Sequence, residues 1–360
     1  MVNVKFFGVG CMVPGLIECN DPDIWTEKVT AAFDEIPSVE RFKVFDVKDL
    51  DFSWIGDGYA TPNLQRFAIP KSGAIVFTVT IPTRLQTMPL VRQIDVERFN
   101  VMTVFSHTHP VTYVECLAKT ETLEDPSMSL AIVREFLRDE FKKRDSTVTL
   151  LTLGPSPFHA NFSLQIGTGD HQVGNGFTAT VNKGLGYDTI TYFHEDKDIL
   201  TDLYWEIFPQ LSHFYDFTRS RNRRLRSADA LSTKAEEITE AFKRRGPKAY
   251  ISRALTMRHK LQSAQLDAVS ARLSISRHRR FNTESLERLY PSEKATHLKE
   301  YLEKVAEEDY KEEIESAEQV LEILDGRHTQ ELQRFATIAF SLLGVAIGAF
   351  LTAAFRIWWG

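Results

Sequence analysis

An uncharged stretch near the C-terminus constrains this 360-residue chain more than any other feature. Residues 335–355 read FATIAFSLLGVAIGAFLTAAF, 21 residues without a charge, and Arg334 and Arg356 flank them. A helix of this length extends roughly 31 Å at about 1.5 Å per residue, which matches the roughly 30 Å hydrocarbon core of a bilayer. Trp358 and Trp359 follow, as interfacial aromatic anchors do. Because a soluble helix this long normally carries a polar face, the sequence predicts a transmembrane helix.

The transmembrane helix is predicted over residues 335–356, and the bulk of the chain before it is expected in the cytoplasm. The N-terminal MVNVKFFGVGCMVPG has one lysine and no apolar core followed by a small-residue cleavage site, so it does not read as a signal peptide. Arg327 and Arg334 before the segment, against Arg356 after it, agree weakly with the positive-inside rule. We expect a single-pass protein of the cell (inner or plasma) membrane, with three reduced cysteines.

Residues 1–195 are expected to form a cytosolic α/β (α+β) domain. The net charge of −6 and the hydrophobic content of 43% fit a globular body with one membrane helix. Apolar, β-rich runs predict strands at Val2–Val9, Phe42–Val47, Ala74–Ile81, Phe99–Phe105, Thr147–Leu153, Phe162–Ile166, Phe177–Val181 and Thr189–Phe193. Helices are predicted over Asp23–Ile36 and Ser127–Arg144. These elements indicate a central sheet with helices on its faces.

Residues 196–334 are expected to form a long helical hairpin and stalk. The first predicted helix covers 196–243, with a kink at Pro209, and a break follows at Gly246-Pro247. The second covers 249–280. The third begins near Ser285 or Pro291 and ends at Asp325, with a kink at Asp325-Gly326. Apolar residues recur at heptad-like spacing in the third helix, at Leu298, Leu302, Val305, Tyr310, Ile314, Ala317, Leu321 and Leu324. Through this apolar stripe the third helix packs either on its own hairpin partner or on copies of itself. The two interpretations are compatible.

Charge is segregated within this helical half. Residues 219–280 hold 17 Lys or Arg and 5 Asp or Glu, whereas residues 281–334 hold 7 Lys or Arg and 15 Asp or Glu. One interpretation is that basic and acidic helices pair antiparallel. Another is that acidic residues collect a divalent cation, with Glu308, Asp309 and Glu312 as candidate ligands. A third is that basic residues bind phosphate-rich ligands, RNA or anionic headgroups, with Arg221, Arg223, Arg224, Arg277, Arg279 and Arg280 as candidates.

In the predicted transmembrane helix, Phe340, Gly344, Gly348 and Thr352 lie on one stripe. Gly344 and Gly348 form a GxxxG pattern, which lets helix backbones approach closely in lipid. The polar side chains of the segment are Thr337, Ser341 and Thr352. If copies of this helix surround a pore, the wall is largely apolar with hydroxyls, as in a dewetting gate.

The stalk and the apolar segment resemble the stalk-to-span junction of the CorA-type magnesium transporter family. The matching stretch, residues 300–350, reads EYLEKVAEEDYKEEIESAEQVLEILDGRHTQELQRFATIAFSLLGVAIGAF. In that family a cytosolic α/β domain precedes two long helices and a stalk helix that enters the first membrane span. The resemblance implies a funnel-like homo-oligomer of four or more copies, a pentamer by the family's example. The family's Gly-Met-Asn signature and second span have no counterpart here, so the resemblance carries over neither selectivity residues nor magnesium transport.

Two motifs are candidates for chemistry in the first domain. His107 and His109 follow an apolar strand with a spacing used by metal sites, and they faintly resemble the His-x-His-Pro of JAMM-type metallopeptidases. The Ser and Asp that this family needs downstream fall here on Leu117 and Thr120, so surface-loop histidines are the alternative. The Gly-rich loop at 167–176 is interpreted as a phosphate-binding loop or as hairpin turns. With no nucleophile-elbow motif, nothing makes an enzyme the leading interpretation.

Two functions of different classes follow from these patterns. The first is a C-terminally anchored oligomer whose α/β domain senses a cytosolic ligand or protein partner and controls an ion-conducting or membrane-perturbing bundle of spans. The second is a tail-anchored binding protein or enzyme whose span serves only as an anchor. Membrane lipid is the expected partner in both, nucleic acid is not expected, and the only cofactor indicated is a divalent cation.

Overall fold

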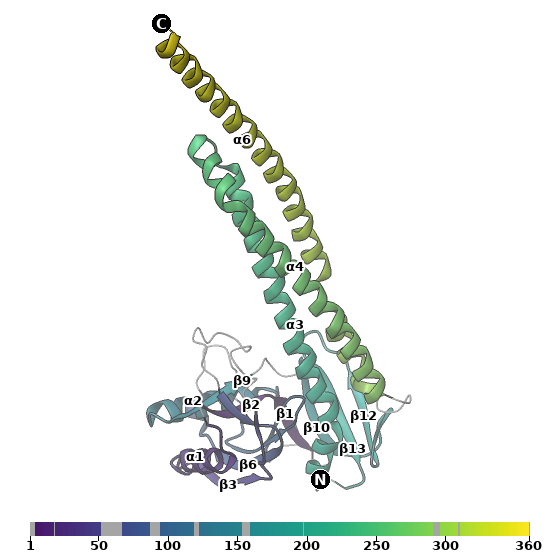
Figure 1. Ribbon diagram of the computed structural model, residues 1–360. Helices are drawn as coiled ribbons and strands as arrows, with labels where there is room; N and C mark the ends of the chain where they lie inside the picture. Colours follow the sequence, from purple (N-terminus) through teal and green to yellow (C-terminus); the bar gives the residue numbers. More distant parts are fainter. Residues whose placement is uncertain are drawn as a thin grey trace. The chain divides into compact units, whose positions relative to one another are not determined.

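The computed structural model describes residues 4–17, 19–51, 67–86, 94–118, 122–152, 159–196, 198–290, 296–308 and 310–359. The chain forms two compact units (Figure 1). The sheet unit comprises Met1–Asn222 and Phe281–Glu308, and the helical unit comprises Arg223–Arg280 and Asp309–Gly360. Two helices, α3 (Leu200–Lys243) and α4 (Pro247–Leu289), contribute to both units.

The sheet unit is built on a mixed nine-stranded sheet. Its order is β11 (His171–Gly174), β12 (Phe177–Asn182), β13 (Asp188–His194), β10 (Ala160–Ile166), β1 (Lys5–Gly10), β8 (Val111–Cys116), β7 (Arg98–Phe105), β6 (Gly73–Thr80) and β3 (Val39–Phe45). Of these neighbours, β10 and β13 are parallel and the other pairs are antiparallel. A second sheet has the order β4 (Leu50–Asp51), β5 (Phe67–Pro70), β2 (Met12–Ile17) and β9 (Val148–Thr152). All eight predicted strands are confirmed, as is the mixed class of the domain.

Helix α2 (Met128–Lys143) covers one face of the large sheet against β1. Glycines in β1 make this contact possible, because a Cβ at Gly8 or Gly10 would overlap Ser129 or Leu130 of α2. Helix α1 (Pro22–Asp34) contacts β3, and its N-cap Asp21 accepts a hydrogen bond from the Asp23 amide. Both helices had been predicted from their apolar periodicity.

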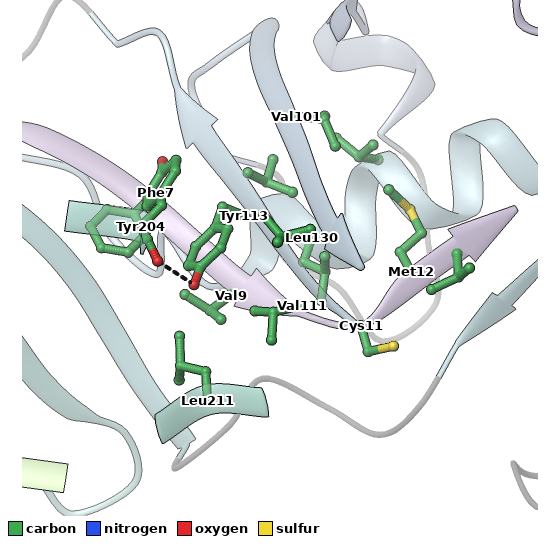
Figure 2. Packing of buried hydrophobic residues seen from close by; sticks show 14 of the residues in the cluster. Phe7, Val9, Cys11, Met12, Val101, Val111, Tyr113, Leu130, Tyr204 and Leu211 are labelled. Carbon is green, nitrogen blue, oxygen red and sulfur yellow. Dashed lines mark hydrogen bonds between the residues drawn. The ribbon is translucent and has the colours of Figure 1, made fainter. Parts of the chain in front are cut away.

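The first part of α3 packs on the opposite face of β1. Phe7 and Val9 point to that side, since side chains alternate along a strand, and the Phe7 ring lies 5.2 Å from the Tyr204 ring. The Tyr113 ring stacks on Tyr204 at 4.1 Å, and its hydroxyl donates to the Tyr204 backbone carbonyl at 2.9 Å (Figure 2). Leu211 continues this buried face of α3 (Figure 2). The sheet is therefore covered on both faces at its centre.

The helical unit is a three-helix assembly of α3, α4 and α6 (Lys311–Trp359) with its own core. The core residues recur in alternating steps of three and four: Ala228, Leu231, Ala235, Ile238 and Phe242 in α3, Met257, Leu261, Ala264, Ala268, Ala271 and Ile275 in α4, and Ile314, Ala317, Leu321 and Leu324 in α6. This is the spacing of coiled-coil packing. The predicted packing of the stalk on its own hairpin partners is confirmed. Its packing on further copies stays a prediction.

The main difference from the predicted helices is the division of the third one. The break at Gly246 is confirmed, with φ of 113°, and α3 runs through Pro209 as one helix. The predicted third helix is two helices, α5 (Lys299–Glu307) and α6, separated near Tyr310, whose φ is 55°. Helix α6 continues through Gly326, and a kink at that residue stays a prediction.

Candidate functional site

Helix α6 changes character along its length. One face of its first part is buried in the core of the helical unit, whereas the apolar segment is half-buried at residues 335 and 336 and exposed over residues 337–355. Leu342, Val345 and Phe350 are 67%, 71% and 75% exposed. An 18-residue window of the helix has a mean hydropathy of 2.2, and none of it is buried inside the structure. Helix α6 is thus long and apolar enough to cross a membrane, and full exposure sets it apart from a core helix of a soluble protein.

The polar groups of the apolar segment are satisfied within α6. The hydroxyls of Thr337, Ser341 and Thr352 donate to backbone carbonyls four residues earlier, at 2.9, 2.8 and 2.7 Å. A Cβ added at Gly344 or Gly348 would meet no atom within 4 Å. The helical repeat places these five predicted residues along one side of α6. Within the described part of the chain nothing covers that side.

A cavity of about 710 Å³ lies in the sheet unit beside α5. The β12–β13 connection, α3 and α5 supply its walls, which carry five carboxylates and three lysine or arginine side chains. Among the described lining residues there is no serine or cysteine that could act as a nucleophile. The cavity is therefore suited to binding a polar ligand with groups of both charges.

One wall of the cavity is a charged network around Tyr301 of α5. The Tyr301 hydroxyl donates to the Asp188 carboxylate, and the Lys183 ammonium lies 4.0 Å from the centre of the Tyr301 ring. Lys183 also lies 3.5 Å from both Asp188 and Glu300. Partial burial disfavours the charged lysine, but the Tyr301 hydroxyl and the two carboxylates outweigh it and raise the pKa of Lys183. Burial, with the hydrogen bond to Asp188, raises the pKa of Tyr301 to about 12.

The α3 wall of the cavity contains buried polar atoms. Tyr215, Thr218 and Arg221 are spaced by three along α3 and all line the cavity. The Tyr215 hydroxyl and the Thr218 hydroxyl are buried and make no hydrogen bond within the described residues. Arg221 pairs with Glu308 at 3.0 Å, and this pair closes the end of the wall. Buried polar groups without partners are costly, so they favour a ligand that would satisfy them.

The predicted metal pair does not form one site. His107 is exposed, whereas His109 is fully buried, stacks on the Tyr215 ring at 5.4 Å and has its Nδ1 3.0 Å from the Pro110 carbonyl. Burial lowers the pKa of His109 to about 3. No group of three or more His, Cys, Asp or Glu side chains fit to hold a metal occurs among the described residues.

The predicted acidic ligands lie on either side of the chain boundary between the two units. Glu308 belongs to the sheet unit, where it pairs with Arg221, and Glu312 is the second residue of α6 in the helical unit. Asp309 lies outside the described residues. A divalent-cation role for these carboxylates stays a prediction.

The predicted basic residues divide between the two units. Arg221 is in the sheet unit, whereas Arg223, Arg224, Arg277, Arg279 and Arg280 are in the helical unit. Arg224 is 3% exposed, and Arg277 is exposed on α4. Basic α4 pairs with acidic α6 through Arg272 and Glu318, 3.2 Å apart, and through Arg253 and Glu331. The predicted pairing of basic with acidic helices is thus confirmed.

The Gly-rich loop at 167–176 includes the β10–β11 connection, β11 and the turn of the hairpin that β11 forms with β12. The Gly169 amide donates to the Thr178 hydroxyl at 2.7 Å, and a Cβ at Gly169 would overlap the backbone of Ala179. Gly174, Asn175 and Gly176 have φ of 152°, 47° and 82°. The glycines are explained by these turns, in line with the hairpin interpretation.

Sequence reasoning missed the cavity residues Lys183, Asp188, Tyr215 and Tyr301. Asp188 and Tyr301 are 113 positions apart, so no local motif connects them. The only local signal is the charged and glycine-rich connection between β12 and β13, which contains Lys183, Gly184 and Gly186. Comparison of the chain with protein-family models, curated proteins and solved structures finds no match.

Proposed function

We propose that the protein is a single-span membrane receptor, in which a cytosolic body binds a small polar ligand and the apolar segment of α6 holds that body at the membrane. The observation that carries this proposal is the change along α6 from a buried heptad face to a wholly exposed apolar surface within one helix. An exposed apolar surface of this length is costly in water and favourable in a bilayer.

The cavity beside α5 supports a sensing role. Its wall includes Glu300, Tyr301 and Glu308, and the chain passes from there directly into α6. A ligand in the cavity would influence the span only if it bound two states of the protein with different affinity. The ligand class that fits the lining carries a cationic group for the carboxylates and an anionic or hydroxyl group for Lys183 and the α3 wall.

Association of the spans of several copies would give the apolar segment a role beyond anchoring the protein. The face of Gly344 and Gly348 lets two backbones approach, and the neighbouring hydroxyls are already bonded within the helix. Several copies would form a narrow, apolar and hydroxyl-bearing bundle that conducts ions or perturbs the membrane. The resemblance to CorA-type transporters stays a prediction, and so does the number of copies. The alternative function is a tail-anchored binding protein whose span is only an anchor.

The two functions are separated by the mass of the full-length complex in nanodiscs, measured by native mass spectrometry. A receptor with a bundle of spans predicts a closed complex of four or more copies, which Gly348→Ile reduces to smaller species. Ala346→Ile adds similar bulk on the opposite side of the helix and leaves the mass unchanged. A monomeric wild-type protein would favour the anchor alternative.

A further inference from the structure

Cations concentrate at the turn that joins α3 to α4. Residues 241–253 include Lys243, Arg244, Arg245, Lys248 and Arg253 and no acidic residue. The first four of these side chains are exposed, and Lys243 also pairs with Glu240 at 2.6 Å. We call Lys243, Arg244, Arg245 and Lys248 the turn cations.

The backbone of this turn adds to the positive charge. Pro247 is the first residue of α4, a helix of 43 residues, and the first amides of a long helix carry partial positive charge. Arg253 braces the turn from within, because its guanidinium donates to the backbone carbonyls of Arg244 at 2.7 Å and Ala241 at 3.3 Å. The turn is therefore a braced structure with its cations directed outward.

The turn is fixed beside the start of the apolar segment. The Tyr250 hydroxyl donates to the Glu331 backbone carbonyl at 2.6 Å, and its ring lies 6.2 Å from the Phe335 ring. Arg253 also donates to both oxygens of the Glu331 carboxylate, at 3.0 and 3.1 Å. Glu331 precedes the first residue of the apolar segment by roughly 6 Å of helix. This spacing is less than the Debye length of about 8 Å at physiological salt.

A cavity of about 900 Å³ opens between the turn and α6 in the helical unit. Its lining combines cations, including Arg244, Arg245 and Arg327, with apolar side chains, including Ile251 and Ile338. Arg334 adds a further exposed cation on α6. The lining thus matches a phospholipid, whose phosphate is anionic and whose acyl chains are apolar.

We propose that the α3–α4 turn docks on anionic phospholipid headgroups of the leaflet that α6 enters. This rests on the proposed function, in that the apolar segment must lie in the bilayer. The headgroup phosphates meet the turn cations, Arg327 and Arg334, while Ile251 and Ile338 lie toward the acyl chains. Docking fixes the helical unit at the membrane surface at a second point besides the span.

The test is the lipid selectivity of the full-length protein in nanodiscs that contain equal amounts of phosphatidylglycerol and phosphatidylcholine. The protein is released into the gas phase, and native mass spectrometry gives the ratio of the two lipids that stay bound. We expect phosphatidylglycerol to be preferred. Each cation near an anionic surface contributes roughly fivefold, so Arg244→Gln, Arg245→Gln and Lys248→Gln together should lower the ratio by about a hundredfold.

Two control variants accompany this triple change. Arg277→Gln, Arg279→Gln and Arg280→Gln remove the same charge about 45 Å along α4 and should keep the preference. The double variant Arg244→Lys and Arg245→Lys keeps the positive charge, so it should also keep the preference for phosphatidylglycerol. Circular dichroism of each variant confirms that the helices are intact.

Equal retention of the two lipids by the wild-type protein would overturn the docking proposal while leaving the membrane anchor in place. A preference that survives the triple change at the turn, or that disappears equally in the distant control, would also overturn it. Failure of the full-length protein to enter nanodiscs would contradict the proposed function itself. Competition by soluble glycerol phosphate at the same concentration as the lipid would show an anion site, not a lipid surface, and would overturn the docking proposal.

Discussion

Two histidines, His109 and His297, lie in the interior of the sheet unit, where burial favours the neutral ring. His297 is 5% exposed, and its Nε2 lies 3.1 Å from the Tyr192 hydroxyl. Burial lowers the pKa of each histidine to about 3, against 6.5 for an exposed one. The spacing of His107 and His109 had predicted a metal pair, but the chain turns after β7 and sends one ring outward and the other inward. Sequence spacing cannot predict such a turn, because nothing local marks it.

These histidines predict an acid-sensitive sheet unit. Above about pH 7.5 both rings are neutral in the folded and the unfolded state, so they have no effect on the pH dependence of stability. Between about pH 6.5 and 3 the unfolded chain binds protons that the folded state does not, and stability falls by up to about 1.4 kcal/mol per pH unit for each histidine. His109→Gln should reduce that slope, measured by denaturant unfolding at a series of pH values.

The control for this prediction is His107→Gln, two residues away on the exposed side of the same loop. It should leave the slope unchanged. A slope that is the same in wild type and His109→Gln would contradict the assignment of a neutral buried ring.

At the scale of single elements, the heptad stripe of α6 was readable from the sequence because each of its positions is apolar. The separation of α5 from α6 could not be predicted from the sequence. Residues 308–310 contain neither glycine nor proline, yet Tyr310 adopts a positive φ. The cavity was not readable either, because β12, β13, α3 and α5 bring its residues together only in the folded sheet unit.

The heptad stripe gives a matched pair of substitutions on α6. Leu321 is fully buried in the helical core, and Ile323, two residues on, is 71% exposed. Leu321→Ala should destabilise the helical unit by roughly 2 to 5 kcal/mol, because it leaves a cavity in a packed core. Ile323→Ala should change stability by no more than about 0.5 kcal/mol. Denaturant unfolding followed by circular dichroism compares them, and equal effects would contradict the assigned face.

The brace at the α3–α4 turn gives a second prediction at this scale. Arg253 is 8% exposed and joins two turn carbonyls to the Glu331 carboxylate. Arg253→Ala leaves that carboxylate without its partner and should cost about 3 kcal/mol, seen as faster amide exchange over residues 241–253. Arg253→Lys should not restore protection, because an ammonium lacks the guanidinium fork. Arg258→Ala, on the exposed side of α4, serves as the control, and slow exchange in Arg253→Ala would refute the brace.

At the scale of the whole molecule, the helical unit ends in an apolar segment whose membrane-length window has no residue buried inside the structure. The class of the first domain, the helical hairpin and the position of the apolar segment were all predictable, because each depends on periodicity or on a long uniform run. The ligand, the partners and the number of copies could not be predicted, because they depend on surface residues that follow no periodic pattern.

Removal of the apolar segment should therefore leave both units folded. A chain that ends at Thr337 keeps Phe335 and its contact with Tyr250, and every removed residue whose side chain the structure describes is exposed. Its stability should equal that of the full chain within about 0.5 kcal/mol, while it stays in solution without detergent. Loss of the helical unit's unfolding transition on truncation would show that the segment is part of a core.

The central claim is that the apolar segment of α6 crosses a membrane, and cysteine accessibility in intact cells tests it most directly. Cys11, Cys19 and Cys116 are buried, so the background is low. Ile357→Cys, at a position 86% exposed beyond the segment, should react with a membrane-impermeant maleimide added outside the cells. Gln330→Cys, at an exposed position before the segment, should react only after the membrane is opened. Labelling of both positions only after lysis would contradict a membrane-crossing helix.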